Sequence, residues 1–156
     1  MNQGAVIAGR TVADATRNLA GLILLVVVAM LMGFRFSSLS GAVAAVALTL
    51  AVGFAFSWLS AAIAAKVRNP EMVGMLSMFW LFPLMLASSA FAPPESMPGW
   101  LQGFATHQPI SVATEAVRGL TAGSQAGGDV LYALAWVLGM LMVFIPLSSR
   151  LYRKAP

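Results

Sequence analysis

The chain has 156 residues, of which 60% are hydrophobic and only 9% are charged. A soluble domain carries about 25% charged residues, so this composition excludes an ordinary soluble domain and a disordered segment. The absence of cysteine excludes a disulfide scaffold and a cysteine-ligated metal site. We therefore read the sequence as an all-α membrane protein. In this class the net charge of +4 reports orientation, and it is no sign of nucleic-acid binding.

Long uncharged stretches of the sequence can be compared with the roughly 20 residues that cross a bilayer as a helix. They predict four transmembrane helices, at about residues 19–34, 41–65, 72–91 and 130–149. We expect residues 1–18 to be a cytoplasmic amphipathic segment and residues 92–129 to be an extracellular re-entrant or interfacial segment. The whole chain, 1–156, is then a single transmembrane domain. A signal peptide is the alternative for the first span, but no small-x-small cleavage site follows it.

The basic residues predict the orientation, because Lys and Arg are enriched on the cytoplasmic side. Four spans place both termini on the same side of the membrane. That side would hold most of the basic residues, namely Arg10, Arg17, Lys66, Arg68, Arg150, Arg153 and Lys154. Only Arg35 and Arg118 would lie on the other side. We therefore expect a multi-pass protein with both termini in the cytoplasm.

The second predicted span has a small side chain at every fourth position. Lipid offers no hydrophobic drive between helices, so such a stripe favours close backbone approach and van der Waals packing inside a bundle. Chance is the alternative explanation, because Gly and Ala are common in apolar sequences. The stripe consists of Gly41, Ala45, Thr49, Gly53, Ser57, Ala61 and Ala65.

The third predicted span is rich in methionine and aromatic residues and contains Pro83, which favours a kink. Methionine repacks around molecules of different shape, so this helix could line a pathway for a large apolar molecule. The alternative is that these side chains face lipid or neighbouring helices. The candidates for lining a pathway are Met75, Phe79, Phe82 and Met85.

Prolines divide the following segment into two short amphipathic helices. Pro98 can open a short helix, and Met97, Trp100, Leu101 and Phe104 have the spacing of one apolar face. After Pro109 a second helix is expected, with Glu115 three residues from Arg118. Neither helix is long enough to cross, so we expect both in the outer interface, with Trp100 at headgroup level. The only histidine of the sequence, His107, is read as a polar cap or a headgroup contact.

No catalytic, cofactor-binding or metal-binding motif is found in the sequence. A phosphate-binding loop needs a Lys-Ser or Lys-Thr pair after glycines, and neither lysine of the chain has that context. The aspartates lie outside the predicted spans, so the residues for intramembrane proteolysis are absent. We therefore expect that this chain is not an enzyme and binds no cofactor itself.

Eight motifs, taken in order, resemble one family of membrane proteins. They are Gly9 to Leu19, Gly33 to Arg35, Phe56 to Leu59, Val67 to Glu71, Phe82 to Leu84, Phe91 to Leu101, Gln108-Pro109 and Glu115 to Leu120. Together they resemble the ABC-2 type transporter permeases, in particular the daunorubicin-resistance-like drug exporters of bacteria. Gln108-Pro109 is a small departure, since many relatives have Asn-Pro there.

The resemblance implies a permease subunit in the bacterial plasma membrane that exports hydrophobic drugs, antibiotics or lipids. It implies a homodimer or heterodimer of permeases and a separate cytoplasmic ABC ATPase subunit, which would bind ATP and Mg. Candidate contacts with that ATPase are Arg10, Asp14, Arg17, Lys66, Arg68 and Glu71. The implied outer gate is formed by Met97, Trp100, Leu101, Phe104, Glu115 and Arg118.

Length is the main departure from the resemblance. Family members have six spans, and the four predicted here match the third to the sixth. We therefore expect that the first two spans are missing. The alternative to a permease is a truncated, non-transporting membrane scaffold or an inactive remnant of a permease.

Overall fold

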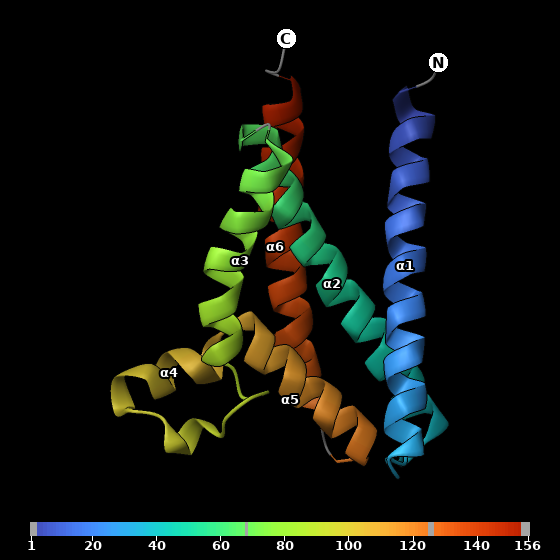
Figure 1. The fold of residues 1–156 in the computed structure, drawn as a ribbon. Helices are drawn as coiled ribbons and strands as arrows, with labels where there is room; N and C mark the ends of the chain where they lie inside the picture. The colour runs from blue at the N-terminus through green and yellow to red at the C-terminus, as the bar shows by residue number, and fades with distance from the viewer. Residues whose placement is uncertain (1–2, 68, 125–126, 154–156) are drawn as a thin grey trace.

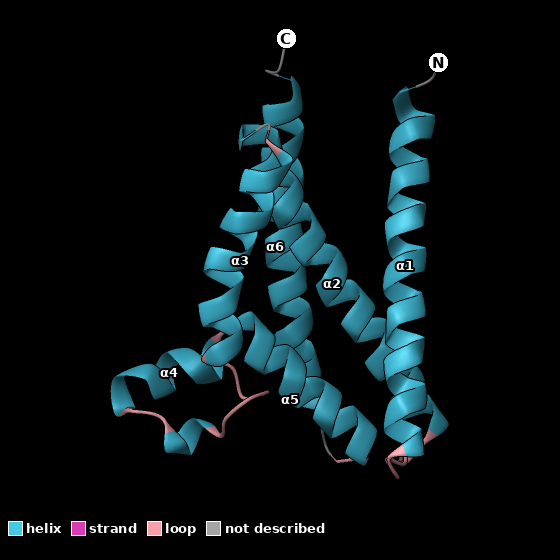
Figure 2. Ribbon diagram, in the orientation of Figure 1, coloured by secondary structure: helices cyan, strands magenta, loops and turns pink. Residues whose placement is uncertain are grey.

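The computed structural model describes residues 3–67, 69–124 and 127–153, with the side chains of 3–15, 65, 70, 149 and 151–153 outside the description. Every regular element in these ranges is a helix, as Figure 2 shows. The predicted all-α class is therefore confirmed. The elements are α1 (Gln3–Leu31), α2 (Leu39–Val67), α3 (Pro70–Leu86), the 3-10 helix η1 (Pro94–Ser96), α4 (Gly99–His107), α5 (Pro109–Ala122) and α6 (Gly127–Arg153).

The four long helices run along the molecule in alternating directions, with α2 tilted across the bundle (Figure 1). The start of α1 and the end of α6 lie at the same end of the molecule. Helices α4 and α5 lie across the opposite end, between the end of α3 and the start of α6. This arrangement agrees with the predicted order of long and short helices.

Two helical segments of the described chain are long and apolar enough to cross a membrane, Leu39–Ala64 and Gly127–Ser148. The other two expected spans correspond to shorter apolar segments, Thr16–Leu31 and Glu71–Leu86. A helix rises only 1.5 Å per residue, so segments of that length fall short of a hydrocarbon core of about 30 Å. The count of four spans therefore stays a prediction.

Helix α1 is continuous from Gln3 to Leu31, so the expected segment 1–18 and the first span form one element. The sequence has no proline in this range, and nothing local stops the helix before Leu31. The stop comes at Gly33, whose φ of 97° lies in the left-handed region that glycine adopts without strain. The helix thus ends three residues before the predicted boundary at residue 34.

Helix α3 begins at Pro70, two residues before the predicted start at residue 72, and ends earlier than residue 91. Asn69 caps it, with Oδ1 accepting a hydrogen bond of 3.0 Å from the backbone N–H of Glu71. The helix continues through Pro83 and ends at Leu86. Beyond it, the Oγ of Ser88 accepts from the N–H of Ala90, a local bond that competes with helix formation.

The core lies where α2, α5 and α6 meet. Leu48 of α2, Val112 and Ala116 of α5 and Ala133 of α6 are buried together. Along α2 the buried residues recur with the spacing of a coiled-coil seam, on the face toward α6, and they are Ala45, Leu48, Ala55 and Ala62. Most of them are alanine, which brings the helix backbones close together.

A close backbone contact joins the start of α2 to the end of α5. A Cβ atom added to Gly41 would overlap the carbonyl oxygen of Leu120. The N–H of Ser37 donates to the carbonyl of Thr121 at 3.0 Å. Gly123 ends α5 with a φ of 73°, beside the side chain of Ser37. Glycine is needed at 41 for space, and at 123 for both space and conformation.

Candidate transport surface and outer hollow

The small-residue stripe of α2 divides into two parts in the structure. Gly41 and Ala45 pack closely, Gly41 against α5 and Ala45 as a buried residue. Thr49, Gly53 and Ser57 instead line a hollow between α2 and α1, and a Cβ on Gly53 would meet no atom within 4 Å. Ala61 is half-buried, and the side chain of Ala65 is outside the description. Among the described side chains of the stripe, the first two positions therefore give tight packing and the next three line a hollow.

The hollow between α1 and α2 has a volume of about 570 Å³. Asn18, Gly21, Leu22 and Leu25 line it from α1. Thr49 and Ser57 turn their hydroxyls back onto the carbonyls of Ala45 and Gly53 of their own helix, at 2.8 and 3.0 Å. The hydroxyls are thus satisfied locally, and the hollow offers a largely apolar surface.

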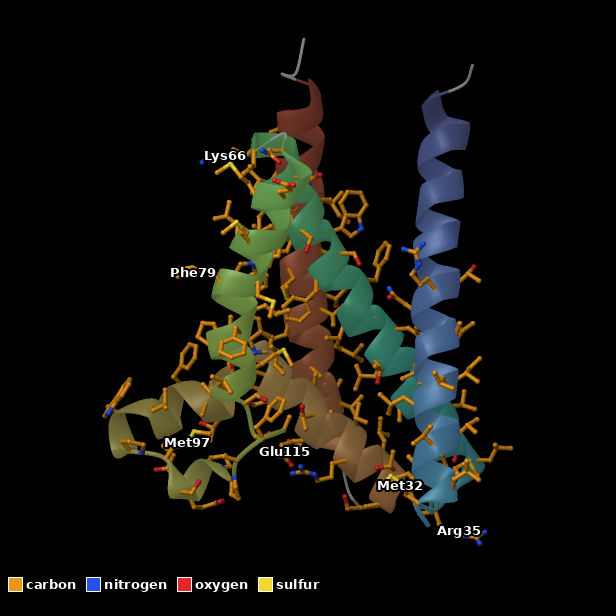
Figure 3. The ribbon with its side chains drawn as sticks, viewed as in Figure 1. Met32, Arg35, Lys66, Phe79, Met97 and Glu115 are labelled. Carbon is orange, nitrogen blue, oxygen red and sulfur yellow. The ribbon has the colours of Figure 1, made fainter. Side chains whose placement is uncertain are left out.

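The four pathway candidates of α3 project outward from the chain. Met75, Phe79, Phe82 and Met85 are all exposed, with Phe79 81% exposed and directed away from the other helices (Figure 3). The opposite face of α3 packs on α2, where Trp80 stacks on Phe56 with ring centroids 5.8 Å apart. The candidates therefore form an apolar surface on the outside of this chain and do not line a channel within it.

The outer-gate candidates gather at the end of the molecule that holds α4 and α5 (Figure 3). Met97 follows η1 and is half-buried, as is Leu101. Trp100 and Phe104 are exposed on α4, Trp100 by 81%. The face predicted to be apolar is thus only partly buried, as expected for helices that meet lipid or a partner.

The predicted pairing of Glu115 with Arg118 is confirmed. Arg118 Nη1 donates to Glu115 Oε1 at 2.9 Å, and both side chains are well exposed. An exposed ion pair of this kind contributes only about 0–1 kcal/mol to stability. His107 also acts at a helix end, because its Nδ1 lies 2.9 Å from the carbonyl oxygen of Gly103 in the last turn of α4.

A second hollow, of about 580 Å³, lies beside this ion pair, and we call it the outer hollow. The segment after α3 forms one wall and helices α4 and α5 form the others. Its charged residues are Glu95, Glu115 and Arg118. Phe91 and two prolines provide apolar wall, and Ser89, Thr106 and Ser111 provide hydroxyl groups.

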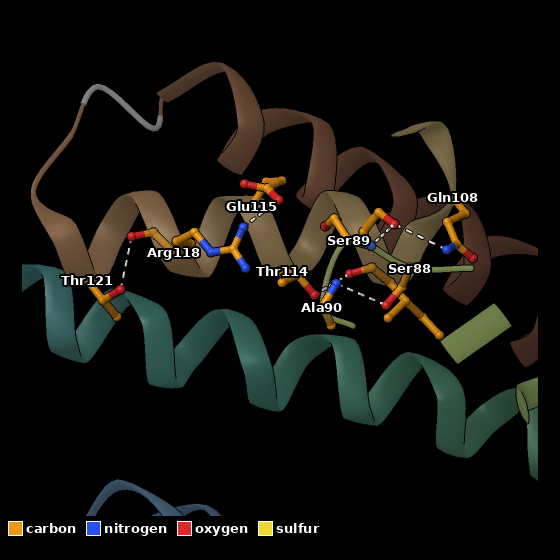
Figure 4. A network of polar contacts seen from close by, with 10 residues as sticks. Ser88, Ser89, Ala90, Gln108, Thr114, Glu115, Arg118 and Thr121 are labelled. Atoms are coloured by element: carbon orange, nitrogen blue, oxygen red, sulfur yellow. Dashed lines mark hydrogen bonds and ion pairs between the residues drawn. The ribbon is translucent and has the colours of Figure 1, made fainter. Parts of the chain in front are cut away.

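A buried polar cluster, which the sequence reasoning missed, stands at the base of the outer hollow. Figure 4 shows it between the end of α3 and the start of α5. The Oγ of Ser111 accepts from the backbone N–H of Ser89 at 3.0 Å and from Gln108 Nε2 at 3.1 Å. Ser88, Ser89, Gln108 and Ser111 are all at least 94% buried. The only sequence signal was the glutamine before Pro109.

The residues expected to contact an ATPase are placed only in part. Lys66 is exposed at the end of α2, at the end of the molecule where α1 begins (Figure 3), and Glu71 is exposed in the first turn of α3. Arg17 is exposed in the middle of α1. Arg68 lies outside the described residues, as do the side chains of Arg10 and Asp14. The described part therefore brings Lys66 and Glu71 together at one end, and Arg17 lies further along the bundle.

Comparison with known proteins identifies the family to which this chain belongs. Residues 1–121 match the ABC-2 type transporter family. The chain is 38% identical over 153 residues to the daunorubicin resistance ABC transporter permease protein DrrB1 of Streptomyces coeruleorubidus. This chain belongs to the ABC-2 type transporter family. The resemblance inferred from the motifs is thereby confirmed.

Other relatives agree with this family. The chain is 33% identical over 90 residues to the probable doxorubicin resistance ABC transporter permease protein DrrC of Mycobacterium tuberculosis, in strains CDC 1551 and H37Rv. That match covers 57% of this chain and 30% of DrrC, whereas the match to DrrB1 covers 97% of this chain and 54% of DrrB1. The matched region thus spans about half the length of DrrB1 and about a third of the length of DrrC. No solved structure matches it.

Membership of the ABC-2 family fixes the general class of the protein. The family comprises the membrane permease subunits of ABC transporters, which are not enzymes themselves. Together with the apolar helices, it makes this chain a multi-pass membrane protein.

Proposed function

We propose that this chain is a membrane permease subunit of an ATP-driven exporter that moves hydrophobic drugs, antibiotics or lipids out of a bacterial cell. The observation that carries the proposal is the 38% identity to DrrB1 over 97% of the chain. A separate cytoplasmic ABC ATPase subunit would bind ATP and Mg and drive transport. The chain itself supplies a surface for that subunit and part of the wall of the pathway.

The arrangement of charges supports a contact between this chain and a separate cytoplasmic ATPase. Lys66 and Glu71 lie at the end of the molecule where α1 begins and α6 ends. In the proposed orientation this end is cytoplasmic, because basic residues are retained on that side. A cytoplasmic ATPase would therefore meet the loop between α2 and α3 and the start of α1, with Arg10, Asp14 and Arg17 as further contacts.

The outward surface of α3 supports a pathway shared with other helices. Exposed methionine and aromatic side chains adapt to large apolar molecules of different shape. Met75, Phe79, Phe82 and Met85 are exposed in the described part of the chain, so a pathway along them needs a second wall. We propose that a second permease copy, identical or related, or further spans of the same transporter supply it.

The test of the proposal is an efflux assay with a partner. The chain is expressed with an ABC ATPase encoded beside it, in cells that lack drug exporters, and daunorubicin accumulation is followed by fluorescence. We expect reduced accumulation and co-purification of the ATPase. Normal accumulation without ATPase association would contradict the proposal and favour the alternative of a non-transporting scaffold.

Coupling is tested by reversing the charges of Asp14 and Arg17 together, as Asp14→Arg and Arg17→Asp. We expect the variant to insert normally, because the net charge of the segment is unchanged. Drug-stimulated ATP hydrolysis by the partner should fall, since the contact would present the wrong sign of charge at each position. Unchanged drug-stimulated hydrolysis would exclude a coupling role for these two residues.

A further inference from the structure

The hollow between α1 and α2 has the depth of one leaflet of a bilayer. Its lining runs from Asn18 to Leu25 on α1 and from Thr49 to Ser60 on α2. At 1.5 Å per residue, these stretches extend about 11 and 17 Å along the two helices. One leaflet supplies about 15 Å of hydrocarbon, half of a core that is about 30 Å thick. The hollow is therefore deep enough for the chain of one lipid and too shallow for a helix that crosses both leaflets.

One end of the hollow coincides with a boundary of the apolar segments. Asn18 is two residues from the start of Thr16–Leu31, and Ser60 is four residues from the end of Leu39–Ala64. This boundary faces the end of the molecule that holds the start of α1 and Lys66 (Figure 3), which is the cytoplasmic end in the proposed orientation. The other end of the hollow lies near the middle of each segment. The hollow thus opens at the cytoplasmic interface and ends inside the membrane.

A positive charge stands at the interfacial end of the hollow. Arg17 is the one charged residue of the segment 16–31, and it directly precedes Asn18. It lies four residues before Gly21, so both residues are on the face of α1 that borders the hollow. Arg17 is exposed and forms no ion pair with a described side chain. A guanidinium binds phosphate through two parallel hydrogen bonds, and basic pockets between helices on the cytoplasmic side of a membrane bind lipid headgroups.

The walls beyond Arg17 suit a flexible hydrocarbon chain. The hydroxyls of Thr49 and Ser57 are bonded within α2, which leaves a largely apolar lining. A Cβ atom added to Gly21 or Gly53 would meet no atom within 4 Å, so the space between the helices is open at both residues. The two helices converge on the short loop that joins them (Figure 1), which closes the hollow on that side.

We propose that the hollow holds an acyl chain of a phospholipid from the cytoplasmic leaflet, with the lipid phosphate bound by Arg17 and Asn18. The lipid fills space that α1 and α2 leave open and so holds the two helices together. The inference goes beyond the proposed export function, because it concerns a lipid that the chain binds without an ATPase.

The test is native mass spectrometry of the chain in detergent, without an ATPase, during titration with dioleoyl-phosphatidylglycerol. We expect saturable binding of one lipid per chain. Arg17→Gln should weaken this binding about tenfold, the scale of one hydrogen bond to a charged group. Gly53→Leu should also weaken it about tenfold, because the new side chain takes the space of the acyl chain. If Gly53→Leu does not fold, Gly21→Leu fills the hollow from α1.

Matched controls make the same chemical changes away from the hollow. Arg35→Gln removes an exposed arginine at the opposite end of the molecule (Figure 3), and Gly74→Leu adds a leucine at an open position of α3. Neither residue belongs to the lining, so both variants should bind the lipid as the native chain does. Absence of saturable binding, or equal losses in the test and control variants, would overturn the proposal.

Dioleoylglycerol, which has the same acyl chains and no phosphate, separates the two parts of the site. It should bind the native chain about tenfold more weakly than phosphatidylglycerol does, and Arg17→Gln should not weaken it further. Equal binding of the two lipids by the native chain would exclude the phosphate contact.

The same spectra report whether a second copy of the chain occupies the hollow. A shift from dimer to monomer in Gly53→Leu, with the lipid count unchanged, would assign the hollow to a second copy and overturn the proposal. Failure of the efflux assay, with lipid binding intact, would count against the proposed function alone. Because no ATPase is present, a contact between Arg17 and that subunit cannot produce the expected result.

Discussion

Single glycines on α2 have different roles although the sequence presents them as equivalent. Gly41 and Gly53 belong to the same predicted stripe and lie in the same helix. Only Gly41 touches another backbone, that of Leu120, while the space beside Gly53 is open. A glycine that allows two backbones to touch is essential to packing, and one beside a hollow is not.

We predict that Gly41→Ala destabilises the protein and Gly53→Ala does not. The new methyl group at 41 overlaps a backbone carbonyl, and overpacking costs about 1–3 kcal/mol. Alanine at 53 adds only its better helix propensity, worth about 0.5–1 kcal/mol. Melting temperatures in detergent would show a loss for the first variant alone, and equal values for both would disprove the contact.

The hydroxyl of Ser111 holds the end of α3 against the start of α5. We predict that Ser111→Ala lowers stability by about 1–3 kcal/mol, because it leaves the buried N–H of Ser89 and the amide of Gln108 without their acceptor. Ser57→Ala is the control, since that exposed hydroxyl bonds only within its own helix and should change stability by less than about 0.5 kcal/mol. Chemical denaturation in detergent compares the two, and similar midpoints would contradict the role of Ser111.

At the scale of elements, α3 shows how local signals set helix boundaries. Its start is fixed by the cap at Asn69 and by Pro70, both visible in the sequence. Beyond its end at Leu86, Ser88 accepts from the N–H of Ala90, and the N–H of Ser89 donates to Ser111, which lies on another helix. The start was therefore predicted to within two residues, and the end was placed five residues too late because one of these partners is distant in sequence.

The side chain of Asn69 stabilises the first turn of α3, and substitutions at this residue test its role. Asn69→Ala removes the acceptor for the N–H of Glu71 and should cost about 1 kcal/mol. Asn69→Asp keeps a side-chain oxygen as the hydrogen-bond acceptor and should retain the native stability. Hydrogen exchange of the first turn of α3 measures the effect, and equal exchange in the two variants would rule out the cap.

For the whole molecule, the arrangement of helices predicts which loops share a side of the membrane. The start of α1, the end of α6 and Lys66 lie at one end of the bundle, and Arg35 and Ser96 belong to segments at the other (Figure 3). If α2 and α3 both cross the membrane, Lys66 lies on the side opposite to Arg35 and Ser96. The predicted orientation makes the side of Lys66 the cytoplasmic one.

We predict that a membrane-impermeant maleimide labels Arg35→Cys and Ser96→Cys in intact cells and labels Lys66→Cys only after lysis. The native sequence has no cysteine, so the background of the experiment is low. Equal labelling of Lys66→Cys and Ser96→Cys would show that α3 does not cross. Reversed labelling would show that the termini are extracellular.

The sequence by itself determined the helical class, the starts of α2, α3 and α6 to within three residues, the Glu115–Arg118 pair and the family. These follow from local properties: hydrophobic length, caps, prolines and short-range motifs. Only the tertiary structure decided that the methionine and aromatic side chains of α3 point outward. Only it decided that three of the seven residues of the α2 stripe line a hollow, and that four polar residues are buried together. Such features depend on which faces of distant helices meet, and no local pattern in a single sequence encodes that pairing.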